Sequence, residues 1–293
     1  MKTKGSASPV SFALLTLLFA VSALWAEAGS AAGAPPPRRA IVATPVVAAT
    51  TEHVVDVPLS SGAQQRVLYV APASPEATIV MLPGGSGRIG LSPDGNLRHA
   101  DNFVVRTRDM WAAQGYAVVI PDAIDHANLR GLRSSSDYAS VVADLVRFAK
   151  AQAAVPVFLL GTSQGSIAAA NGAAHAPPGT LAGVVMTESV SRFGGSHETV
   201  FDAGLENIRV PALVVANRDD RCPVAPPEDA AKIAAAMKQS PDVHAVEVSG
   251  GIAASAKACG SLSPHGYYGI EAQVVASIGD WLRGQLRPKG RGD

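Results

Sequence analysis

The chain has 293 residues, of which 47% are hydrophobic and 16% are charged, and its formal net charge at pH 7 is +0. That length is enough for one large domain with a substantial core. A neutral chain gives no electrostatic reason to bind nucleic acid or an anionic membrane surface, so we expect neither as a partner.

The first 28 residues are typical of a secretory signal peptide. Two lysines precede the apolar run Val10–Trp25, and small residues with an Ala-x-Ala pattern follow, ending at Ala28. We expect cleavage after Ala28 and a secreted or periplasmic protein that keeps no stable membrane anchor. An uncleaved membrane anchor is the alternative, but the apolar run is a little short to span a bilayer.

Beyond the signal, the sequence predicts a linker over residues 29–50, one folded domain over 51–287 and a tail over 288–293. Within the domain, short apolar runs alternate with helix-like segments. Strands are expected at residues 53–59, 65–72, 77–83, 116–122, 155–161, 181–189, 211–217 and 244–250. Helices are expected at residues 102–115, 135–153, 166–176, 226–239 and 268–286.

Most strand-like runs from residue 77 onward are almost continuously apolar, which is typical of strands covered by helices on both faces. The first two runs are more mixed, as edge or antiparallel strands would be. The alternation therefore predicts an α/β fold with a doubly wound, mostly parallel eight-stranded sheet. Only residues 190–209 separate the sixth and seventh strands, so we expect a small cap over the sheet or none.

The pentapeptide Gly-Thr-Ser-Gln-Gly at residues 161–165 joins an apolar strand to an alanine-rich helix. Gly-x-Ser-x-Gly alone is a weak signal, and its strand-to-helix context is what gives it meaning. A tight turn there strains the backbone of the central serine and exposes its hydroxyl, while the glycines avoid clashes. We therefore predict that Ser163 is a nucleophile. A phosphate-binding loop and a plain turn are the alternatives.

A nucleophilic serine needs a histidine base and an acid, and the acid usually precedes the histidine in the chain. His265 lies in a polar loop directly before the last predicted helix, whereas His244 lies inside a predicted strand. We therefore predict His265 as the base. The favoured acid is Asp220, just past the seventh strand, with Asp219 and Glu188 as alternatives.

Backbone amides that bind a developing oxyanion are expected from two places. One is Gln164, directly after the nucleophile, and the other is Gly85, in the glycine-rich loop after the third strand, with Ser86 as the alternative. That loop lacks the Gly-Lys-Ser/Thr of nucleotide sites, and no His/Cys/Asp cluster has the spacing of a zinc site. We expect no metal and no cofactor.

Four motifs in this order resemble the α/β-hydrolase family: Leu-Pro-Gly-Gly-Ser-Gly at 82–87, Gly-Thr-Ser-Gln-Gly at 161–165, Arg-Asp-Asp-Arg-Cys-Pro at 218–223 and Pro-His-Gly-Tyr-Tyr-Gly-Ile-Glu at 264–271. The resemblance extends over roughly residues 54–286. It implies hydrolysis of an ester, thioester or related acyl bond through an acyl-serine. Two residues depart from the pattern: Pro83, where many lipases carry histidine, and Asn217, where glycine is common before the acid.

The chain has two cysteines, Cys222 and Cys259, and in an exported protein such a pair suggests one disulfide. In the α/β-hydrolase fold, the loops that carry them emerge at the same edge of the sheet. A Cys222–Cys259 bond would therefore tie the acid loop to the histidine loop. Two buried free thiols are the alternative.

The sequence thus predicts an exported serine esterase with an open site, acting on a small-molecule or polymer ester. A peptidase, lactonase or thioesterase using the same three residues is one alternative. A non-catalytic binding protein on a hydrolase scaffold is another. Arg130 and Arg133 are expected to be exposed surface residues rather than partners of a substrate carboxylate.

Overall fold

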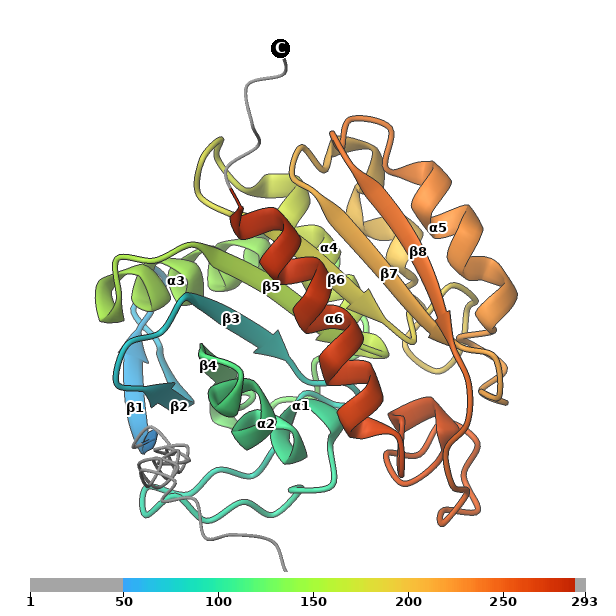
Figure 1. Ribbon diagram of the computed structural model, residues 1–293. Helices are drawn as coiled ribbons and strands as arrows, with labels where there is room; N and C mark the ends of the chain where they lie inside the picture. Colours follow the sequence, from blue (N-terminus) through green and yellow to red (C-terminus); the bar gives the residue numbers. More distant parts are fainter. Residues whose placement is uncertain (1–49, 288–293) are drawn as a thin grey trace, which may run out of the picture. The chain divides into compact units, whose positions relative to one another are not determined.

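One eight-stranded sheet organises the computed structural model, which describes residues 50–287 (Figure 1). The strands are β1 (Thr50–Pro58), β2 (Gln64–Pro72), β3 (Ala77–Leu82), β4 (Tyr116–Pro121), β5 (Val157–Thr162), β6 (Gly183–Thr187), β7 (Ala212–Asn217) and β8 (Val243–Val248). They lie in the order β1-β2-β4-β3-β5-β6-β7-β8. The predicted signal peptide, the predicted tail and all but the last residue of the predicted linker lie outside the described residues.

Strand β2 alone runs against the others. It pairs antiparallel with both β1 and β4, while every pair from β4–β3 to β7–β8 is parallel. The predicted mostly parallel, eight-stranded sheet is therefore confirmed. Because the carboxyl ends of parallel strands share one edge, the loops that follow β3, β5, β7 and β8 meet there.

Helices cover both faces of the sheet, as the doubly wound prediction requires. On one face, the helices that bury side chains against the sheet are α3 (Ser136–Gln152), α4 (Gln164–His175) and α5 (Ala230–Ala236). On the other face, the corresponding helices are α1 (Phe103–Arg106), α2 (Arg108–Ala113) and α6 (Glu271–Leu286). In Figure 1, α6 crosses in front of β5 and β6. No helix within residues 50–287 combines the length and the apolar character needed to cross a bilayer.

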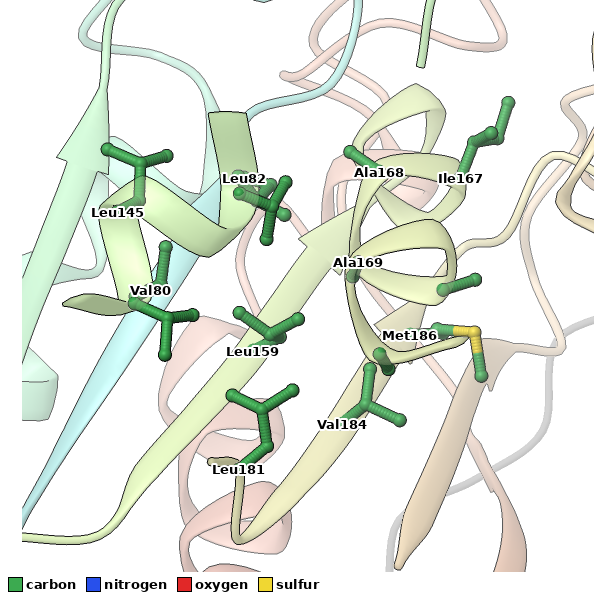
Figure 2. Close-up of a cluster of buried hydrophobic side chains, with 14 of the residues drawn as sticks. Val80, Leu82, Leu145, Leu159, Ile167, Ala168, Ala169, Leu181, Val184 and Met186 are labelled. Carbon is green, nitrogen blue, oxygen red and sulfur yellow. The ribbon is translucent and has the colours of Figure 1, made fainter. Parts of the chain in front are cut away.

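The core around α4 explains why small residues follow β5. Figure 2 shows Ala168 and Ala169 of α4 close to the side chains that rise from β5 and β6. Among these are Leu159 and Val184, which are fully buried like the two alanines. Short side chains let the helix lie near the sheet. Gly172 does the same toward α3, since a Cβ there would lie 2.4 Å from a valine methyl carbon of that helix.

Two of the five predicted helices lie within two residues of their expected limits, and the other three differ more. The segment 102–115 is broken into α1 and α2 at Thr107, whose hydroxyl donates to the carbonyl four residues earlier at 2.7 Å. The helix predicted over 226–239 is shortened to α5, and its proline-rich start forms the 3-10 turn η4 (Pro227–Asp229) instead. The helix predicted over 268–286 begins three residues late, after a glycine with φ of 86°.

The connection between β6 and β7 is short, as expected. It forms two 3-10 turns, η2 (Val200–Ala203) and η3 (Leu205–Asn207). Two further 3-10 turns lie in loops at the carboxyl edge of the sheet: η1 (Ile124–His126) and η5 (Pro264–Gly266). The last of these carries His265.

Candidate active site

Ser163 occupies the turn between β5 and α4 in an unusual backbone conformation. Its φ is 54° and its ψ is −123°, values that a non-glycine residue adopts only under constraint. A Cβ on Gly161 would lie 2.1 Å from the Gly165 carbonyl oxygen, and a Cβ on Gly165 would lie 2.1 Å from the Leu82 carbonyl oxygen. The turn is therefore compressed against β3. Only glycines fit two residues before and two residues after Ser163, whose own side chain is partly exposed.

The imidazole of His265 links Ser163 to Asp220. Its Nε2 lies 2.9 Å from Ser163 Oγ, and its Nδ1 lies 2.7 Å from Asp220 Oδ2. Both His265 and Asp220 are buried. The second Asp220 oxygen, Oδ1, accepts the Cys222 amide at 2.7 Å. If Nδ1–H donates to the carboxylate, Nε2 is free to accept the serine proton.

The neighbouring Asp219 is held in another direction. Its Oδ2 accepts the Gly250 amide at 2.7 Å, and its own amide donates to Asn217 Oδ1 at 3.1 Å. The structure therefore brings Asp220, rather than Asp219, to His265.

Asn217, one of the two departures from the family pattern, braces the histidine loop. Its Nδ2 donates to the Gly250 carbonyl at 2.9 Å and to the Pro264 carbonyl at 3.0 Å. The end of β7 is thereby tied to the residue that precedes His265. Sequence reasoning missed this role, and the replacement of the usual glycine was the one signal that could have revealed it.

Glu188, the third candidate acid, adjoins Asp220. It directly follows β6 with φ of 45°, is buried, and accepts the Asn217 amide at 2.9 Å through Oε1. Burial, reinforced by the negative Asp220, raises the pKa of the Glu188 carboxyl well above its ordinary value. Polar atoms of Glu188, Asp220 and His265 lie within 4.8 Å of one another. Hydrogen bonds already engage both Asp220 oxygens and His265 Nδ1, so these residues form a bonded network rather than a free set of metal ligands.

The glycine-rich loop after β3 lies against the turn at Ser163. A Cβ on Gly84 would lie 2.9 Å from the carbonyl oxygen of the residue before Ser163, and Gly85 has φ of 61°. Both glycines, with Ser163 and His265, line a cavity of about 90 Å³. Gln164 is the first residue of α4, so its amide has no acceptor within the helix. The two residues predicted to bind the oxyanion thus belong to the segments that border Ser163.

Arg133 was expected at the surface, and this prediction is wrong: its side chain is fully buried. Its Nη2 donates to the Pro83 carbonyl at 3.3 Å, and its Nη1 has no hydrogen-bond partner among the described residues. A Cβ on Gly87 would lie 3.0 Å from Nη2, so the glycine-rich loop folds over the guanidinium. Burial lowers the pKa of Arg133. Arg130, in contrast, is exposed.

Cys222 and Cys259 form a disulfide, with their Cα atoms 4.7 Å apart. The bond joins the loop after β7, which carries Asp220, to the segment that leads to His265. Cys259 also lines the cavity at Ser163. The cross-link therefore connects the two loops that carry the hydrogen-bonded Asp220 and His265.

No protein-family model matches the chain, and no curated protein matches it in sequence. Solved structures do match. Est1E from Butyrivibrio proteoclasticus is 12% identical with a TM-score of 0.54, over 80% of this chain and 99% of that one. An esterase from Pyrococcus furiosus is 12% identical with a TM-score of 0.59, over 81% and 92%. A dienelactone hydrolase from Anabaena variabilis is 16% identical with a TM-score of 0.58, over 81% and 99%. Together with the strand order and helix layers, these likenesses show that the chain has the α/β-hydrolase fold.

Proposed function

We propose that the protein is an exported serine hydrolase that cleaves a carboxylic ester. The observation that carries this proposal is the hydrogen-bonded chain from Ser163 through His265 to Asp220, which begins at a strained strand-to-helix turn. That combination supports the proposal, because nucleophilic acyl transfer requires a hydroxyl, a base and a buried carboxylate in this order.

In the proposed reaction, Ser163 Oγ attacks the acyl carbon of the ester while His265 Nε2 takes the hydroxyl proton. Asp220 holds the imidazole in position and stabilises its positive charge. The amides of Gln164 and Gly85 donate to the oxyanion of the tetrahedral intermediate. His265 then gives its proton to the leaving alcohol, and the acyl group remains on Ser163. A water molecule repeats the sequence and releases the carboxylic acid.

Structural neighbours support an ester as the substrate. Est1E has also been solved with ferulic acid, a carboxylic acid, bound to it, and the Pyrococcus furiosus neighbour is named an esterase. Export is supported by the signal-like sequence of residues 1–28 and by the disulfide, because such bonds persist in oxidising compartments.

The direct test is turnover of p-nitrophenyl acetate and p-nitrophenyl butyrate by the purified protein and by a Ser163→Ala variant. Loss of the nucleophile should lower kcat by about 10³-fold or more. Ser140→Ala is a matched control, because Ser140 is exposed on α3 and should leave turnover unchanged. A folded wild-type protein that cleaves neither ester, or a Ser163→Ala variant that keeps full turnover, would refute the proposal.

A further inference from the structure

A cavity of about 380 Å³ adjoins the smaller one at Ser163. The two share four lining residues, Gly84, Gly85, Asn102 and Ser261. The two cavities are therefore direct neighbours, and a molecule whose scissile bond lies at Ser163 has the larger cavity beside it. The volume is within the range that small-molecule sites occupy.

Positive charge dominates the lining of this larger cavity. Arg88, Arg98 and Lys257 contribute three cations, against the one acidic side chain of Asp101. His99 lines it as well. Since the whole chain has a formal net charge of +0, this excess is a local feature.

Within residues 50–287, the three cations have no counter-ions. Arg88, Arg98 and Lys257 are exposed, and none of them forms an ion pair with any residue in the range 50–287. Arginines elsewhere in the same range, such as Arg106 and Arg192, are paired with carboxylates. The cations at the cavity are therefore available to a ligand.

The loop that carries Arg88 and Arg98 is anchored. The buried carboxylate of Asp122 accepts the amides of Ile89 and Leu91, both at 2.8 Å. The Arg98 amide donates to a carbonyl of the same loop at 3.2 Å. Lys257 comes from a different segment, two residues from the disulfide-bonded Cys259. The positive groups that line the cavity thus come from two separate segments, each tied to the rest of the fold.

We propose that the natural substrate is an ester that also carries a carboxylate, which binds among Arg88, Arg98 and Lys257 while the ester carbonyl lies at Ser163. This inference rests on the proposed function, and it adds the class of ester. Arginine binds a carboxylate through paired N–H donors, and a lysine adds a third positive group.

The test compares two p-nitrophenyl esters that differ in whether the distal carboxyl is free or methylated: the anionic mono-p-nitrophenyl glutarate and the neutral p-nitrophenyl methyl glutarate. Wild type should show a kcat/KM about tenfold or more higher for the anionic ester. In the variant Arg88→Glu/Arg98→Glu, that preference should fall by about tenfold or more. Raising NaCl from about 0.02 M to about 0.5 M should also weaken the preference, because salt screens exposed charges.

The matched control is Arg209→Glu/Lys238→Glu, which changes the net charge equally. Both residues are exposed and lie in the connections that enter β7 and β8, at the opposite edge of the sheet. This variant should keep the wild-type preference. Circular dichroism checks that both double variants are folded.

Failure of the inference is distinguishable from failure of the proposed function. If Ser163-dependent turnover is equal for the two esters, the anionic subsite is wrong and the esterase proposal stands. If neither ester is cleaved, calorimetric titration of the protein with anionic monomethyl glutarate and with neutral dimethyl glutarate tests the subsite by binding alone. Binding of the anion alone, lost in Arg88→Glu/Arg98→Glu, supports the subsite. If the protein binds the anionic and the neutral glutarate equally, or binds neither of them, the subsite is refuted.

Discussion

Reduction of the Cys222–Cys259 disulfide should lower the free energy of unfolding by about 4 kcal/mol. The two cysteines are separated by 37 residues in the sequence. In the chain-entropy treatment, closing a loop of that length removes about 13 cal/mol/K from the unfolded chain, or about 4 kcal/mol at 25 °C. For a domain of this size, the same change corresponds to a Tm lower by about 8 to 16 °C.

The assay is thermal unfolding of the oxidised and the dithiothreitol-reduced protein, followed by circular dichroism, with a thiol count to establish that both sulfurs are reduced. A Cys222→Ala/Cys259→Ala variant is the control, because dithiothreitol should leave its Tm unchanged. Ester turnover should fall on reduction as well, since the Cys222 amide holds Asp220. A fully reduced wild type whose Tm drops by less than about 2 °C would refute the reasoning.

Three further predictions concern single residues. Asp220→Asn should lower kcat by about 10³-fold to 10⁴-fold in p-nitrophenyl butyrate turnover, whereas Asp219→Asn should keep most activity; the reverse result would exchange their roles. Gly165→Ala should prevent correct folding, because its Cβ would lie 2.1 Å from a carbonyl oxygen of β3. Gly284→Ala, in open space on α6, should raise the free energy of unfolding by up to about 1 kcal/mol. Equal urea midpoints for the two variants would contradict this prediction. The raised pKa of Glu188 means that the folded protein keeps a proton that the unfolded chain has lost. Between the ordinary carboxyl pKa and the raised pKa of Glu188, each unit of rising pH therefore lowers the free energy of unfolding by up to about 1.4 kcal/mol. Urea unfolding at several pH values should show a gain for Glu188→Gln over wild type that grows with pH, and a constant difference would contradict the linkage.

Much of the fold could be predicted because its signals are local. The eight apolar runs identified the strands, and the nearly continuous hydrophobicity of those such as residues 77–83 indicated coverage on both faces. Helix limits were harder. A break at Thr107 depends on a side-chain hydrogen bond to the preceding turn, and apolar periodicity carries no information about such a bond.

The residues of the candidate site also divide into those with a local sequence signal and those that only the fold identifies. Ser163 was predictable because two glycines and a strand-to-helix transition surround it, and His265 because it precedes the last helix. Asp219 and Asp220 could not be separated with certainty by counting, since they are adjacent and only the fold decides which one faces His265.

The burial of Arg133 and the bracing role of Asn217 depend on distant partners. Arg133 contacts the loop at Pro83, and Asn217 contacts Pro264. Both contacts join segments that are separated by about 50 residues in the sequence. The asparagine in place of the usual glycine marked position 217 as unusual, but neither it nor the arginine identifies a distant partner, so the contacts themselves became visible only in the folded chain.

The measurement that tests the central claim most directly is covalent labelling of the purified protein with a fluorophosphonate, followed by mass spectrometry of its peptides. An activated serine attacks the phosphorus and keeps the adduct, whereas an ordinary serine hydroxyl does not. We predict one adduct per chain, on the peptide that contains Ser163, and none on the Ser163→Ala variant. An adduct on another residue, or none on a folded wild-type protein, would contradict the assignment of Ser163 as the nucleophile.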